Sequence, residues 1–270
     1  MNIKELIKGI IIGIAKIIPG LSGAVLMISF NLYDRAIDAI TNFFSNPKKN
    51  FIFLFNLGLG IVLVFVLFSK IIYYFISKYY LYTMFLFIGL IFGGVTFLYK
   101  NVYKSSKYFL ISLISFVVVF GISTLGGSGE YVLKNTYIDY IVFFIAGFLE
   151  AIGTVMPGVS STALLMMIGV YNYYLVILSG ALNIFYLKET LSFIIPFSLG
   201  MIIGIIILTI IINYLFKYHK AGTYSMVLGI SFSSIFTLTS SSIKYISDIK
   251  TFVLAILMFL LGYFITNKLE

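Results

Sequence analysis

Two charged residues lie in apolar stretches, each a short distance before a Pro-Gly pair. Lys16 precedes Pro19 by three residues in KIIPGLSG, and Glu150 precedes Pro157 by seven in EAIGTVMPGVSS. A lone charge is costly in apolar surroundings, so both are functional candidates whose expected partner is the other residue or a bound anion. The alternative for both is that the side chain snorkels to a membrane interface.

The two Pro-Gly pairs can each start a helix whose first N–H groups bind an anion. Pro fits the first turn of a helix because its missing N–H costs nothing there, and Gly lets a ligand approach the backbone. The positive end of the helix dipole favours phosphate. The alternative is that each break only shapes a tight hairpin for helix packing. The predicted phosphate-binding residues at the breaks are Pro19, Gly20, Leu21, Ser22, Gly23, Pro157, Gly158, Val159, Ser160, Ser161 and Thr162.

Arg35 is a further candidate, and it leaves two interpretations open. Its guanidinium can hold a phosphate with two parallel hydrogen bonds, or it can pair with Asp34 or Asp38 at the inner surface. Tyr33 and Tyr171 are expected at the far ends of the second half-helices, where aromatic anchors at the membrane interface are common.

The composition places these residues in an integral membrane protein. Of the 270 residues, 61% are hydrophobic and 10% charged, and the mean hydropathy is +1.11, far from the values of a soluble domain. The net charge of +9 comes from Lys residues in the short connections, which indicates positive-inside topology and lipid headgroup contact rather than nucleic-acid binding. With no Cys and one His, His219, in a loop, we expect neither cofactor nor metal site.

Helices that cross the membrane must position the two breaks. Apolar length predicts an all-α protein with six spans at 51–74, 81–99, 108–125, 192–216, 223–240 and 250–267. Two further regions, 6–41 and 138–181, are interrupted. Segment 6–18 reaches only about 20 Å as a helix, too short to cross, so each interrupted region is predicted to form a re-entrant hairpin.

The two halves of the chain match each other. Gly9, Pro19 and Tyr33 align with Gly147, Pro157 and Tyr171 at an offset of 138, and the later spans align at 142. Repeat 1 is then 1–126 and repeat 2 is 127–270, each with one hairpin and three crossings. An odd number of crossings inserts the second copy upside down, as an inverted repeat. The Lys distribution puts both termini on the cytoplasmic side.

The doubled break resembles the PopT-type polyprenyl-phosphate translocases. The residues that carry the resemblance are GIIIGIAKIIPGLSGAV with NLYDR, and GFLEAIGTVMPGVSSTA with GVYN. Ala24, Val25 and Ser161 depart from the family pattern, and Asn31 stands where the family usually has Gly. Lys16 lies where the family often has an acid.

The resemblance implies a transporter rather than an enzyme, located in the cytoplasmic membrane. Its implied substrate is undecaprenyl phosphate or a related polyprenyl phosphate, returned to the inner leaflet for envelope synthesis. In this hypothesis Lys16 and the tips bind the phosphate, and alternating access exposes this site to one leaflet at a time. The tail of the substrate stays among membrane lipids. Glu150 either couples transport to a proton or sodium ion or neutralises Lys16. The alternatives are a small-anion or ion transporter with the same tips, and a lipid-modifying enzyme, for which no nucleophile or metal site is evident.

Overall fold

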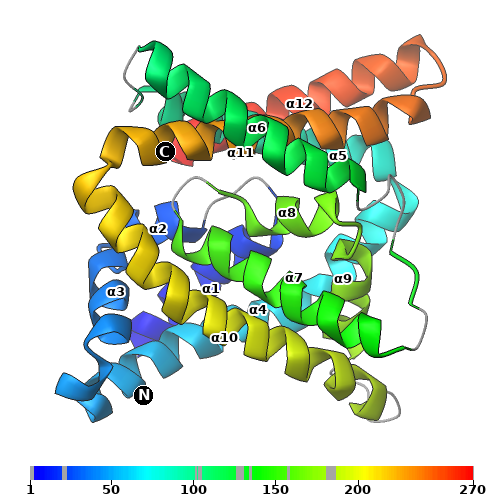
Figure 1. Cartoon of the computed structure of the whole chain (residues 1–270). Coiled ribbons are helices and arrows are strands. Elements are labelled where there is room, and N and C mark those ends of the chain that lie inside the picture. The colour runs from blue at the N-terminus through cyan, green and yellow to red at the C-terminus, as the bar shows by residue number, and fades with distance from the viewer. Residues whose placement is uncertain are drawn as a thin grey trace.

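The computed structural model describes residues 3–19, 23–100, 102, 105–125, 131–133, 136–156, 159–180 and 187–269. All regular structure within these residues is helical, which confirms the predicted all-α membrane protein (Figure 1). The α-helices are α1 (Ile3–Ile17), α2 (Gly23–Ser29), α3 (Tyr33–Thr41), α4 (Pro47–Lys78), α5 (Tyr80–Lys100), α6 (Ser106–Leu125), α7 (Tyr137–Val155), α8 (Ser161–Met167), α9 (Tyr171–Gly180), α10 (Leu187–Tyr218), α11 (Lys220–Ser242) and α12 (Ile249–Leu269). Short 3-10 turns occupy Phe43–Ser45 and Ile243–Tyr245.

Six helices among the described residues are long and apolar enough to cross a membrane. They are Pro47–Lys78, Ser106–Thr124, Tyr137–Val155, Thr190–Tyr218, Lys220–Tyr245 and Ile249–Asn267. Five overlap the predicted spans, and the remaining predicted span, 81–99, falls within the 21 residues of α5. The sixth candidate is α7, which the sequence had placed in a hairpin. Its 19 residues reach about 28 Å, so by length this arm can cross the hydrocarbon core.

Both interrupted regions contain a second break that the sequence analysis missed. Asn31 has φ 55° and Gly169 has φ 74°, and these two residues are 138 positions apart. Gly and Asn tolerate this left-handed backbone, which ends α2 and α8 after seven residues each. The pair Ser161–Met167 and Tyr171–Ser179 is bent by 115°. The prediction that Tyr33 and Tyr171 end the second half-helices is therefore wrong, since each tyrosine begins a new helix.

The first helix of each half packs in parallel against the fourth. A Cβ on Gly9 would overlap the carbonyl oxygen of Leu57, and a Cβ on Gly147 would overlap that of Phe197. Only glycine permits this approach of two backbones. The two glycines are 138 positions apart, but Leu57 and Phe197 are 140 apart. For α4 and α10 the offset of 142 is thus corrected to 140 in the packing, because Ile- and Phe-rich sequences align equally well in several registers.

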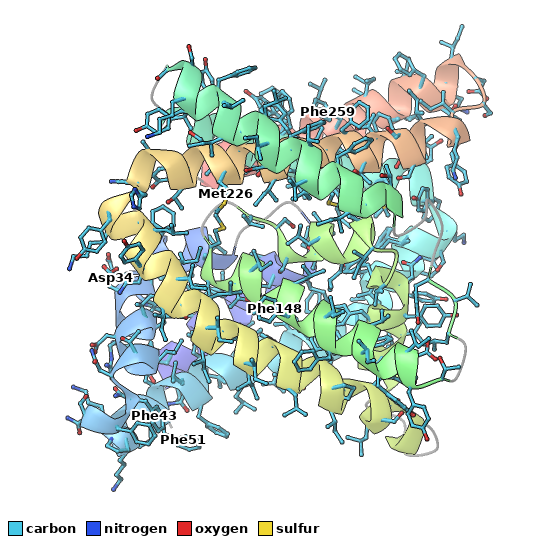
Figure 2. All side chains as sticks on the ribbon, viewed as in Figure 1. Asp34, Phe43, Phe51, Phe148, Met226 and Phe259 are labelled. Carbon is cyan, nitrogen blue, oxygen red and sulfur yellow. The ribbon has the colours of Figure 1, made fainter. Side chains whose placement is uncertain are left out.

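The remaining helices form a second group of parallel pairs, α5 with α12 and α6 with α11. In the first pair Gly89 contacts Phe259 and Gly93 contacts Tyr263. Residue numbers therefore increase in the same direction along both helices, which makes the pair parallel. In Figure 1 this group lies above the helices that carry the breaks. Apolar side chains project from the outside of both groups, such as Phe51, which is 56% exposed (Figure 2). Such an outer surface is suited to lipid.

Candidate functional site

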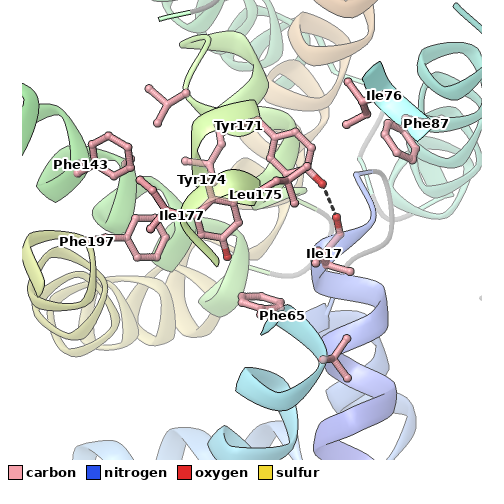
Figure 3. Close-up of a cluster of buried hydrophobic side chains, with 14 of the residues drawn as sticks. Ile17, Phe65, Ile76, Phe87, Phe143, Tyr171, Tyr174, Leu175, Ile177 and Phe197 are labelled. Carbon is pink, nitrogen blue, oxygen red and sulfur yellow. Dashed lines mark hydrogen bonds between the residues drawn. The ribbon is translucent and has the colours of Figure 1, made fainter. Parts of the chain in front are cut away.

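The C-terminal ends of α1 and α7 are joined to the opposite half by two equivalent hydrogen bonds. The Tyr171 hydroxyl donates to the carbonyl oxygen of Ile17 at 2.6 Å (Figure 3), and the Tyr33 hydroxyl donates to that of Val155 at 2.7 Å. The two tyrosines are 138 positions apart, and so are the two residues whose carbonyl oxygens accept these bonds. Each bond satisfies a helix-end carbonyl that has no partner within its own helix. The anchor role predicted for Tyr171 is wrong, because its side chain is only 2% exposed.

Between these helix ends, Lys16 and Glu150 form an ion pair. The Lys16 Nζ lies 2.7 Å from Glu150 Oε1 and 2.5 Å from Thr154 Oγ1. The side chains of Lys16 and Glu150 are 2% and 0% exposed, so neither snorkels to an interface. Of the two partners expected for each charge, the other residue or a bound anion, the structure shows the other residue. Two charges removed from solvent depend strongly on each other, since the loss of one leaves the other uncompensated.

The two carboxylate oxygens of Glu150 differ in their contacts. Oε1 accepts from Lys16 and from the Ser161 hydroxyl, the latter at 2.9 Å. Oε2 is buried and has no hydrogen-bond partner among the described residues. Thr154 donates its own hydroxyl to the Glu150 carbonyl oxygen at 2.8 Å. An ammonium has three N–H donors, so Lys16 has capacity for one acceptor beyond Glu150 and Thr154.

Among the predicted tip residues that are described, Ser161 and Gly23 contact this ion pair. Ser160 caps α8 by accepting from the Ala163 N–H at 3.3 Å, and its hydroxyl lies 3.2 Å from that of Thr162. Pro19, Val159, Ser161 and Thr162 are buried. A Cβ on Gly23 would lie 2.5 Å from the Lys16 Cγ, so this glycine makes room for the lysine. Five predicted tip residues lie outside the described residues, namely Gly20, Leu21, Ser22, Pro157 and Gly158.

A cavity of about 640 Å³ adjoins the ion pair. Its walls come from α2, α3, α4, α9 and α10, and the ends of α1 and α7 contribute Ile12, Lys16, Thr154 and Val155. Most of the lining is apolar. Two buried hydroxyls in the wall, Tyr174 and Thr209, have no hydrogen-bond partner among the described residues. The volume is typical of sites that bind small molecules.

Arg35 is held outside the cavity lining. Its Nη1 lies 3.3 Å from Asp38 Oδ2, its Nη2 donates to Asn50 Oδ1 at 2.9 Å, and its guanidinium lies 5.1 Å from the Phe53 ring centroid. Of the two interpretations left open, the pairing with Asp38 is the one present. His219 is exposed at the N-terminus of α11. Among the described residues, no three His, Cys, Asp or Glu side chains come together in a way that could hold a metal ion.

Sequence reasoning missed Thr154, Tyr174 and Thr209. Thr154 carried a signal, because it lies 138 positions after Lys16 and is therefore the same position in the second half. Tyr174 and Thr209 carried none, since a threonine hydroxyl in an apolar helix commonly bonds to its own backbone and tyrosines are common in membrane proteins at the interface.

The chain is similar in sequence to known membrane transporters. A family model described as undecaprenyl phosphate translocase-like matches residues 12–250. A polyprenyl-phosphate transporter of Staphylococcus aureus is 26% identical over 274 residues, which cover 98% of this chain and 95% of that protein. A polyprenyl-phosphate transporter of Vibrio cholerae is 24% identical over 240 residues, which cover 83% and 73%. No solved structure matches the chain. The resemblance read from the two breaks is confirmed, and the chain belongs to the undecaprenyl phosphate translocase-like family, whose members are named as transporters and not as enzymes.

Proposed function

We propose that this protein carries undecaprenyl phosphate or a close polyprenyl relative across the cytoplasmic membrane and holds the phosphate at Lys16. The observation that supports this most is the Lys16–Glu150 pair, almost fully buried and beside a cavity of about 640 Å³. A lipid phosphate needs its anionic head shielded across the hydrocarbon core, and a buried cation next to an apolar cavity provides that shielding. The tips at 19–23 and 157–162 add N–H and hydroxyl donors.

Glu150 takes the place of the phosphate when the site is empty. Its carboxylate neutralises Lys16, and an arriving phosphate competes for the same ammonium. The displaced carboxylate would be an unpaired buried anion, so uptake of a proton at Glu150 keeps the charge of the site balanced. In this proposal a proton is the coupling ion. If transport depended on the sodium gradient, sodium would be the coupling ion instead.

The two halves, 1–126 and 127–270, act as an inverted repeat whose movement against each other exposes the site to one leaflet at a time. The parallel packing of α1 with α4 and of α7 with α10 supports the equivalence of the halves. The termini lie in the cytoplasm, and the lipid moves from the outer to the inner leaflet, where it is reused in envelope synthesis.

The test is transbilayer movement of a fluorescent polyprenyl phosphate in vesicles that contain the purified protein. We expect Lys16→Met with Glu150→Met to slow the movement by about tenfold or more, because a hydrogen bond to a charged group contributes about 1.5–3 kcal/mol. The matched control is Ser123→Ala with Thr237→Val. This pair removes a 3.2 Å contact between α6 and α11 away from the cavity and should leave the rate unchanged.

Two outcomes would contradict the proposal. Wild-type vesicles that move the lipid no faster than protein-free vesicles would remove its basis. Protection against thermal unfolding by free phosphate or chloride, and none by polyprenyl phosphate, would favour the small-anion transporter instead.

A further inference from the structure

The cavity is much longer than a phosphate group. It is lined along α10 from Phe193 to Thr209 and along α4 from Leu54 to Val66. At 1.5 Å per residue these stretches span about 24 Å and about 18 Å. Its few polar lining groups include Lys16 and Thr154, and the walls beyond them are mainly Ile, Leu, Val and Phe. A phosphate at Lys16 would leave most of this volume to an apolar ligand.

The cavity has an apolar rim formed by an equivalent pair of residues. Val62 of α4 and Ile202 of α10 line the cavity and are 55% and 56% exposed. They are 140 positions apart, which is the offset between the residues of α4 that pack on α1 and those of α10 that pack on α7. The neighbouring residues Leu63 and Ile203 are also exposed. An opening with an apolar rim of this kind is suited to the hydrocarbon of the membrane rather than to water.

We propose that the cavity is a binding site for the part of the isoprenoid chain nearest the phosphate, and that the chain leaves sideways between Val62 and Ile202. This inference rests on the proposed function and revises one part of it, because the first isoprene units then lie inside the protein and only the rest of the tail lies in lipid. An extended isoprene unit is about 5 Å long, so the cavity has room for a phosphate and at most about four units. Recognition thus includes the chain as well as the head.

A glycine in the wall offers a clean way to fill the cavity. Gly58 lines it, and a Cβ added there would meet nothing within 4 Å. Gly121 of α6 also has nothing within 4 Å of an added Cβ, but it does not line the cavity. Gly58→Phe and Gly121→Phe are therefore matched variants: each places the same ring in open space on an α-helix, and only one occupies the proposed chain site.

The first experiment is photolabelling of the wild-type protein in vesicles with farnesyl phosphate that carries a diazirine on its last isoprene unit. We expect labels on cavity residues such as Leu57, Phe197 and Met201, reduced by excess unlabelled farnesyl phosphate and unaffected by farnesol. Labels confined to outward-facing residues such as Phe55 and Ile206, which are 51% and 50% exposed, would overturn the chain site.

The second experiment measures the affinities of purified variants for dimethylallyl phosphate and farnesyl phosphate in one detergent. Partitioning of a ligand into detergent is the same for both variants, so the ratio of their affinities for that ligand reports the effect of the cavity alone. We expect Gly58→Phe to lower the affinity for farnesyl phosphate by about tenfold or more relative to Gly121→Phe. The affinities of the two variants for dimethylallyl phosphate should agree within about twofold. Equal losses in both variants would overturn the inference.

The outcomes separate this inference from the proposed function. If wild-type vesicles move polyprenyl phosphate while the probe labels only the outer surface, the chain site fails and transport stands. If the probe labels the cavity but the lipid does not cross, the chain site stands and transport fails.

Discussion

The ends of α1 and α7 share a backbone plan and differ in their charges. Each helix ends at a carbonyl bonded by a tyrosine from the other half. Lys16, however, corresponds to Thr154, and Glu150 corresponds to Ile12. The comparison teaches that the symmetric features hold the two ends together, while the charged chemistry rests on residues present in only one copy.

The asymmetry puts one cation and one anion at a single contact instead of two cations facing each other. A second lysine at position 154 would place two ammonium groups in the same buried space, where repulsion is strong. Thr154 instead accepts from Lys16 and donates to the backbone carbonyl oxygen of Glu150. One charge pair on a symmetric scaffold gives a site that is neutral when empty.

The largest effect should come from removing one charge. Lys16→Met leaves Glu150 buried without its counter-ion, and we expect it to lower the free energy of unfolding by about 3–5 kcal/mol. The added change Glu150→Met should restore most of the stability and none of the transport. Thermal unfolding and the vesicle assay measure the two effects, and a double variant that transports normally would show that the pair is only structural.

The two tyrosine hydrogen bonds should differ in strength because their burial differs. Tyr171 is 2% exposed and Tyr33 is partly exposed. We expect Tyr171→Phe to lower stability by about 1–2 kcal/mol and Tyr33→Phe by about 0.5–1 kcal/mol, because a buried carbonyl left without a donor cannot bond to water. Denaturation of each single variant tests this order, and a larger cost for Tyr33→Phe would contradict it.

The packing contacts of α1 with α4 and of α7 with α10 near the ion pair can be exchanged between the two halves by mutation. Gly13 packs against Val64, whereas Ala151 packs against Gly204, so the small residue is on opposite helices. We expect Gly204→Val to lower stability by about 1–3 kcal/mol through overpacking. Ala151→Gly should recover part of that loss, since it recreates the contact of the first half. If the stability loss of the double variant equalled the sum of the losses of the two single variants, the two contacts would not be equivalent in packing.

The smallest effect is expected at Arg35, which corresponds to Tyr173 in the second half. Its side chain is 31% exposed and paired with Asp38, itself 56% exposed, and such pairs contribute about 0–1 kcal/mol. Arg35→Gln should leave the transport rate within about twofold, because the guanidinium is outside the cavity lining. A much slower variant in the vesicle assay would restore Arg35 as a phosphate ligand.

The sequence by itself determined the membrane class and the family, and it singled out Lys16 and Glu150 as charges whose expected partner was the other residue or a bound anion. These follow from properties that neighbouring residues carry together: apolar length, the doubled Pro-Gly pair, and the high cost of a charge in an apolar helix. The seven-residue length of α2 and α8 was less accessible, since Asn31 gave a weaker signal of a left-handed backbone than Gly169.

Only the tertiary structure decided which residues surround the ion pair and where the cavity opens. Thr154 contacts Lys16, and Tyr171 bonds to Ile17, across 138 and 154 positions of the chain. The exposed lining residues Val62 and Ile202 take their places from the register of α4 on α1 and of α10 on α7. Ile-, Leu- and Phe-rich helices satisfy hydrophobicity in any register, so their contacts are fixed by close packing at a few glycines, and that packing is a property of two helices together rather than of either sequence.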